Sequence, residues 1–143
     1  MSRWSSIPAG DAPEGLILFD GVCVFCSRWV RFVLERDRDR LFRFVAIQSR
    51  SGRELAAVWS IDPERPQTNA VVMNGRVWFK SDAALKVLGA LPATRWMDLL
   101  AKTPKTLRDL VYDHVATNRY RIFGRTNACM IPSPQDRDRF LDA

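Results

Sequence analysis

Two cysteines, Cys23 and Cys26, stand three residues apart directly after the apolar run 16–19. This run predicts a buried strand, and the residues after it have helical spacing, so the first cysteine should begin a helix. At a helix start, free backbone N–H groups and the helix dipole favour a thiolate over a thiol. The pattern therefore predicts a redox-active pair, in which Cys23 is the more exposed thiol and the nucleophile and Cys26 resolves the mixed disulfide.

Asp20 lies three residues before Cys23, and Gly21 between them permits a sharp turn from strand to helix. A carboxylate in this place can cap the free amides of the helix, which is a structural role. It can also accept the proton of Cys26 during reduction of a substrate disulfide, which is a catalytic role. The sequence leaves both roles open, and Asp20 joins the two cysteines as a candidate catalytic residue.

Two other functions remain for a Cys-x-x-Cys pair. One is a structural zinc site, which usually takes four ligands. The only further cysteine and the only histidine are Cys129 and His114, and His114 falls within a predicted helix. The other is a binding module that has lost its turnover. We favour redox chemistry that needs no dissociable cofactor and no metal, acting on a disulfide-containing protein or a small thiol compound.

Two features near the C-terminus have open roles. Cys129 is followed by apolar residues, so we expect a small buried hydrophobe, although a third thiol could also relay a disulfide. Arg119, Arg121 and Arg125 form a basic cluster. The cluster could dock an anionic partner or stabilise the Cys23 thiolate, or it could be a solvated loop that pairs with nearby acids.

The elements that must position these residues follow from the apolar periodicity. Strands are expected at 16–19, 41–47, 71–73 and 77–79, the last two joined by a hairpin turn at Asn74-Gly75. Helices are expected after Cys23, at 51–59 with a capping box that begins at Ser51, at 82–88 with Ser81 as its cap, and from 104 to about 117. A helix between two strands makes them parallel. This order predicts an α/β, thioredoxin-like fold: β-α-β plus β-hairpin-α in a mixed four-stranded sheet, with extra C-terminal helices.

Length and composition limit the class of protein. The 143 residues are 47% hydrophobic and 27% charged, with a net charge of +6, which excludes a disordered tail, a fibre and a disulfide-dense scaffold. Acids alternate with bases at 35–40, which disfavours nucleic-acid binding. We expect a flexible lead-in over 1–14, a single domain over 15–143, no membrane association and a cytoplasmic location. The oligomeric state cannot be inferred.

The motif around the cysteines is similar to a known one. Residues 19–26 contain Asp-Gly-x-Cys-x-x-Cys and resemble the signature of the DCC family of predicted thiol-disulfide oxidoreductases. The resemblance continues through 81–85, 118–124, Cys129 and 139–141, and covers almost the whole chain from about residue 16. It implies a thioredoxin-like fold and disulfide exchange through a mixed disulfide.

Overall fold

The computed structural model describes residues 5–64, 66, 68–124 and 133–141. These residues form a six-stranded mixed sheet with the strand order β1-β5-β4-β2-β3-β6. The strands are β1 (Ile7–Pro8), β2 (Leu16–Phe19), β3 (Arg43–Ala46), β4 (Ala70–Met73), β5 (Arg76–Phe79) and β6 (Phe140–Leu141). The helices are α1 (Val24–Arg36), α2 (Arg50–Val58), α3 (Lys80–Ala90) and α4 (Lys105–Phe123), with 3-10 helices η1 (Pro92–Lys102) and η2 (Arg137–Arg139).

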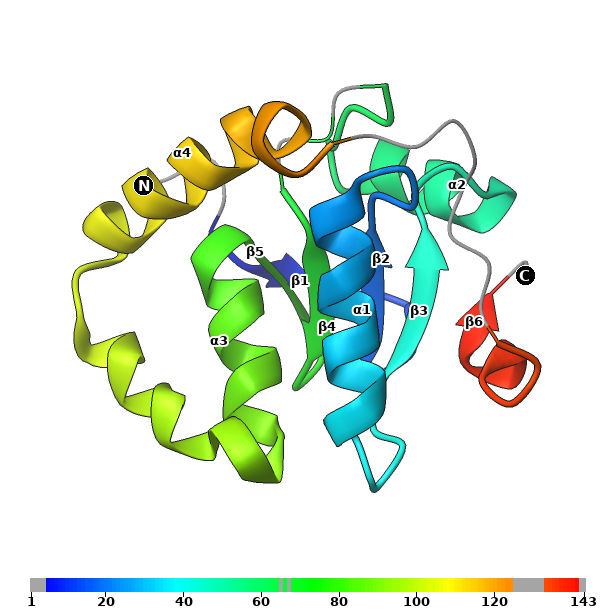
Figure 1. The fold of residues 1–143 in the computed structure, drawn as a ribbon, viewed down its shortest axis with the longest axis horizontal. Coiled ribbons are helices and arrows are strands. Elements are labelled where there is room, and N and C mark those ends of the chain that lie inside the picture. Colours follow the sequence, from blue (N-terminus) through cyan, green and yellow to red (C-terminus); the bar gives the residue numbers. More distant parts are fainter. Residues whose placement is uncertain (1–4, 65, 67, 125–132, 142–143) are drawn as a thin grey trace.

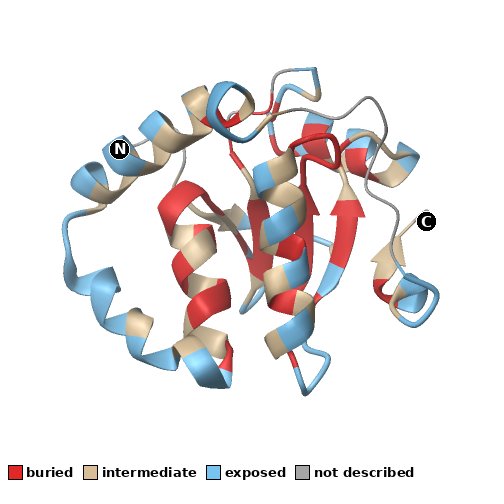
Figure 2. Ribbon diagram, viewed as in Figure 1, coloured by how far each residue is buried: buried red, intermediate tan, exposed pale blue. Residues whose placement is uncertain are grey.

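Helices cover both faces of the sheet. Helices α1 and α3 lie side by side across one face, and η1 and α4 together arch around α3 (Figure 1). The core on this face includes Val30 and Val33 of α1 together with Ile17 of β2 and Val71 of β4. Helix α2 covers the other face, where its Ala56 belongs to a second core. Figure 2 shows that the central strands are buried, whereas much of η1 and α4 is exposed.

The pairing of the central strands determines where the site can form. Strands β2 and β3 run parallel, with Phe19 opposite Ala46. Because parallel strands end at the same edge of the sheet, the residues after Phe19 and after Ala46 are brought together. Strands β4 and β5 form the expected antiparallel hairpin, and Asn74 and Gly75 at its turn both have positive φ, 57° and 74°. The predicted α/β, thioredoxin-like arrangement is confirmed.

The sheet has two more strands than the four expected. Strand β1 pairs antiparallel with β5, although residues 7–8 fall within the expected lead-in. Strand β6 pairs parallel with β3 at the other edge. Each of these strands is two residues long, too short to show the alternation from which a strand is recognised. Pro8 is compatible with β1 because an edge strand leaves one side of its backbone unpaired.

Three helix ends differ from the expectations. Helix α2 is capped by Ser49, whose Oγ accepts a hydrogen bond from the Gly52 amide at 3.0 Å, and not by Ser51. Ser81 does not cap α3, because it lies inside the helix and donates its hydroxyl hydrogen to Asp109. Helix α4 continues past 117 as far as Phe123, so most of the 118–124 segment is helical.

Candidate functional site

The two cysteines lie where the sequence places them, at the junction of β2 and α1. Cys23 is the N-cap residue of α1, with an extended backbone (φ −83°, ψ 122°). Its Sγ accepts a hydrogen bond from the backbone amide of Cys26 at 3.3 Å. A sulfur in this position replaces the oxygen of an ordinary N-cap side chain and satisfies one free amide of the first turn. The cap therefore favours a negative charge on Cys23.

The ionisation of the pair is unequal. A hydrogen bond from the Cys26 thiol is the largest cause that lowers the pKa of Cys23, from 9.0 to about 7, against the opposing effect of burial. The same hydrogen bond, together with burial and the charge of Cys23, raises the pKa of Cys26 well above 9.0. The positive charge of Arg119 adds to the stabilisation of the Cys23 thiolate. Cys23 is therefore the cysteine of the pair that ionises first, and with a pKa of about 7 it is about half thiolate at neutral pH.

The exposure of the two thiols is the reverse of the expected order. Cys23 has no accessible surface (0%), whereas Cys26 is partly exposed. The end of α4 lies against the start of α1: the Val24 amide donates to the Gly124 carbonyl oxygen at 3.3 Å, and the rings of Phe25 and Phe123 are 4.7 Å apart. The prediction that Cys23 is the more exposed thiol is therefore wrong: Cys23 is fully buried at a helix start against which the end of α4 also packs.

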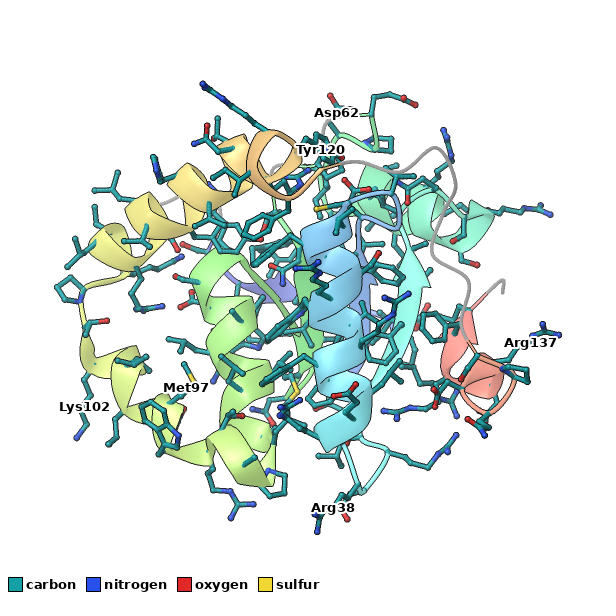
Figure 3. All side chains as sticks on the ribbon, viewed as in Figure 1. Arg38, Asp62, Met97, Lys102, Tyr120 and Arg137 are labelled. Carbon is teal, nitrogen blue, oxygen red and sulfur yellow. The ribbon has the colours of Figure 1, made fainter. Side chains whose placement is uncertain are left out.

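Asp20 is the centre of a buried hydrogen-bond network and is 5% exposed. Its Oδ1 accepts from the Val22 amide at 3.2 Å and from Gln48 Nε2 at 2.7 Å. Its Oδ2 accepts from Arg119 Nη2 at 3.4 Å and from the Tyr120 hydroxyl. The carboxylate thus fixes the turn before α1, while the helix itself is capped by the first cysteine. Figure 3 shows Tyr120 at the end of α4, next to the first turn of α1.

Gln48 and Tyr120 belong to this network, although sequence reasoning did not select them. Gln48 follows β3, the parallel neighbour of β2, and its Oε1 also accepts from the Gly21 amide at 2.9 Å. The shared edge of two parallel strands was a signal that could have found Gln48. Burial, followed by the hydrogen bond to Asp20, raises the pKa of Tyr120 to about 12. The family resemblance at 118–124 includes Tyr120, but it did not indicate that Tyr120 contacts Asp20.

The basic cluster separates in the structure. Arg119 is buried, and its Nη2 donates to the Pro66 carbonyl oxygen at 2.8 Å in addition to its ion pair with Asp20. Arg121 is exposed on the same helix, and Arg125 lies outside the described residues. Arg119 is therefore not part of a solvated loop. It belongs to the cysteine site.

A cavity of about 530 Å³ opens beside the cysteines. Asp20, Cys26 and Arg119 line one part of it, and apolar side chains from α1, α3, η1 and α4 line most of the rest. Cys23 is not among the lining residues. Of the two thiols, Cys26 is therefore the one that a molecule in the cavity would contact.

The remaining candidate residues are not brought to this site in the described structure. His114 lies within α4, where its carbonyl oxygen accepts from Asn118 Nδ2 at 2.8 Å. Cys129 lies outside the described residues. Across residues that are described, no group of three or more His, Cys, Asp or Glu side chains could hold a metal ion. No helix in the described part of the chain is long and apolar enough to cross a membrane.

Comparisons with known proteins agree with the geometry. A family model described as DCC1-like thiol-disulfide oxidoreductase matches residues 17–125. The chain is 40% identical over 130 residues to the uncharacterised protein YuxK of Bacillus subtilis, covering 90% of this chain and 95% of that protein. It is 39% identical over 116 residues to a chloroplastic DCC family protein of Arabidopsis thaliana, covering 80% of this chain and 67% of that protein. No solved structure matches the chain. The family model matches residues 17–125, which include the cysteine pair and the buried Asp20, so the chain belongs to the DCC1-like thiol-disulfide oxidoreductase family.

Proposed function

We propose that this protein exchanges disulfides with a substrate through Cys23 and Cys26. The observation that carries the proposal is the capping geometry: Cys23 Sγ accepts from the Cys26 amide at the start of α1, and its pKa is lowered to about 7. A thiolate, and not a thiol, attacks a disulfide. A nucleophile with a pKa near neutral pH combines a large thiolate fraction with good nucleophilicity.

The first half of the reaction forms a mixed disulfide. The Cys23 thiolate attacks one sulfur of the substrate disulfide, the substrate S–S bond breaks, and the other substrate sulfur leaves as a thiolate that takes a proton from water. In the structure Cys23 has no accessible surface, so this step requires a local opening, and we assign it to the neighbouring contact between the ends of α4 and α1. Opening of a helix end is a local event that costs less than global unfolding.

The second half releases the substrate. Cys26 loses its proton and attacks the Cys23 sulfur of the mixed disulfide, which frees the second substrate thiol and leaves a Cys23–Cys26 disulfide. In the mixed disulfide, Cys23 carries no negative charge, so one cause of the raised Cys26 pKa is removed. The resolving thiol therefore becomes easier to deprotonate at the stage that requires it. A small thiol or dithiol then reduces the protein disulfide and is itself oxidised.

We assign Asp20 as the acceptor of the Cys26 proton. Asp20 and Cys26 line the same cavity, and the hydrogen bonds from Gln48 and Tyr120 hold the carboxylate in a single position. A general base must be held within reach of the proton that it removes, directly or through one water molecule. The structural role of Asp20 in the turn before α1 is compatible with this second role.

The deciding experiment is turnover of a disulfide with a thiol reductant, followed by trapping. We expect Cys23→Ser to abolish turnover, and Cys26→Ser to accumulate a mixed disulfide between Cys23 and the substrate, detected by mass spectrometry. Cys129→Ala is the matched control for the loss of one thiol and should keep most of the turnover.

Two results would contradict the proposal. The absence of turnover and of trapped adduct in the folded, reduced wild-type protein would favour a binding module. One zinc per chain that is lost on Cys23→Ser would favour a zinc site. A cytoplasmic location and the use of no dissociable cofactor remain predictions from the sequence.

A further inference from the structure

The cavity beside Cys26 is larger than the exchange of two sulfur atoms requires. Its volume of about 530 Å³ lies within the range of about 300–1,000 Å³ that is usual for small-molecule sites. Apolar side chains from four elements line it, among them Trp29 of α1, Leu88 of α3, Met97 of η1 and Val115 of α4. Such a lining favours an occupant that is mostly apolar.

The charged groups in the wall of the cavity are already paired. Arg119 forms an ion pair with Asp20, and Arg108 Nη1 contacts Asp82 at 2.9 Å. The Tyr112 hydroxyl is also satisfied, because it donates to Asn69 Oδ1 and accepts from the Asn69 amide, both at 2.9 Å. A charged ligand would have to displace one of these partners, so the wall favours a neutral ligand.

Two N–H groups on residues that line the cavity have no acceptor. Among the described residues, the buried side-chain N or O atoms without a hydrogen-bond partner are Trp29 Nε1 and Arg119 Nε. Both atoms are donors, and neither can accept. A buried donor that lacks a partner carries its full desolvation penalty, which an acceptor on a ligand removes. Both atoms have almost no accessible surface, so a ligand oxygen can reach one of them only after the side chain turns toward the cavity, and the group that it would then supply is an acceptor.

The outer wall of the cavity is apolar as well as open. Leu107 and Val111 of α4 line the cavity and remain 58% and 61% exposed. Both side chains face the solvent and the cavity. An apolar molecule that covers them removes apolar surface from water, which makes its binding more favourable. Leu107 and Val111 thus make the entrance to the cavity apolar on the α4 side.

We propose that this cavity binds a neutral, largely apolar small molecule that carries a hydrogen-bond-accepting oxygen, such as a ketone or an ester. The molecule fills the apolar part of the cavity and lies against Cys26. Its oxygen accepts from Trp29 Nε1 or Arg119 Nε once that side chain has turned toward the cavity.

The test compares two molecules of nearly the same shape, benzophenone and diphenylmethane, which differ in a single carbonyl oxygen. Both are titrated into the full-length reduced protein, and binding is followed by calorimetry or by tryptophan fluorescence. We expect one benzophenone molecule to bind per chain, about threefold to tenfold more tightly than diphenylmethane. A difference in affinity of this size corresponds to one hydrogen bond, worth about 0.5–1.5 kcal/mol.

Variants locate the site. Ala116 lines the cavity, whereas the adjacent Thr117 is exposed and does not line it. Ala116→Phe should therefore weaken benzophenone binding at least tenfold, and Thr117→Phe should leave it unchanged. If Ala116→Phe does not fold, Ala84→Phe fills the cavity from α3. A lack of benzophenone binding, equal affinity for both probes, or full binding by the folded filled-cavity variant would overturn the proposal. None of these results touches the disulfide exchange, because binding is measured without turnover.

Discussion

The amide of Val24, the first residue of α1, donates a hydrogen bond to the carbonyl oxygen of Gly124, 3.3 Å away. The two residues join the helix that carries the cysteines to the end of a helix 100 positions later. Gly124 has a positive φ of 94°, which ends α4 and suits a residue without a Cβ atom. This contact lies directly over the helix start at which the Cys23 sulfur is buried.

The first prediction concerns access to Cys23. Phe123→Ala removes the ring that lies 4.7 Å from Phe25 and loosens the end of α4, so the rate of Cys23 alkylation by iodoacetamide should rise several-fold. Peptide mapping after a short pulse measures the rate at each cysteine. Ile122→Ala is the control, since Ile122 is 62% exposed in the same turn. An unchanged rate in Phe123→Ala would mean that another part of the molecule covers the sulfur.

The second prediction concerns pH. The alkylation rate of Cys23 should rise with pH around a midpoint of about 7 and level off above it, because the thiolate is the reactive form. Cys26→Ala removes the thiol that donates to Cys23, so the midpoint should move upward, toward 9.0. Cys26→Ser keeps a donor and should show a smaller shift. Identical midpoints in wild type and Cys26→Ala would assign the low pKa to the helix start alone.

The third prediction concerns the buried ion pair of Asp20. Asp20→Asn leaves the Arg119 guanidinium buried without its carboxylate, which typically costs about 3–5 kcal/mol in the free energy of unfolding. Urea denaturation measures this loss. The same change should lower the pKa of Tyr120 from about 12, because the hydrogen bond to the carboxylate is the second cause of its increase after burial. Ultraviolet titration detects this, with Tyr120→Phe to identify the signal. Unaltered stability in Asp20→Asn would indicate that the pair is open to solvent.

The fourth prediction separates stability from chemistry at the far edge of the sheet. Arg139 and Asp37 form a buried ion pair, and Arg139 Nη2 also donates to the Phe42 carbonyl oxygen at 3.0 Å. Arg139→Met should therefore cost about 3–5 kcal/mol in unfolding free energy. Arg40→Met breaks an exposed pair with Asp138 and should cost less than about 1 kcal/mol. Both variants should keep the Cys23 pH midpoint, and a shifted midpoint in Arg139→Met would show that this edge is coupled to the site.

The parts that could be predicted from sequence are those with a local cause. The apolar run of β2 and the helical spacing of α1 place Cys23 at the helix start, and Asn74-Gly75 specifies the hairpin. The parts that could not be predicted depend on docking between distant segments. The end of α4 packs against the start of α1 beside the buried Cys23, and two partners of Asp20 are Gln48 and Tyr120, 28 and 100 residues away. No spacing rule within a single helix or strand identifies such partners.

The two short edge strands have a consequence for the nascent chain. Strand β1 precedes β5 in the chain, so the outer partner of β5 is already synthesised when β5 emerges from the ribosome. Strand β3 gains its outer partner only when Phe140 and Leu141 are made, so most of the chain exists before this edge is closed. An open strand edge is a template for pairing with another chain. During translation, the β3 edge is therefore the part of this molecule that is most exposed to incorrect strand pairing with other copies translated from the same mRNA.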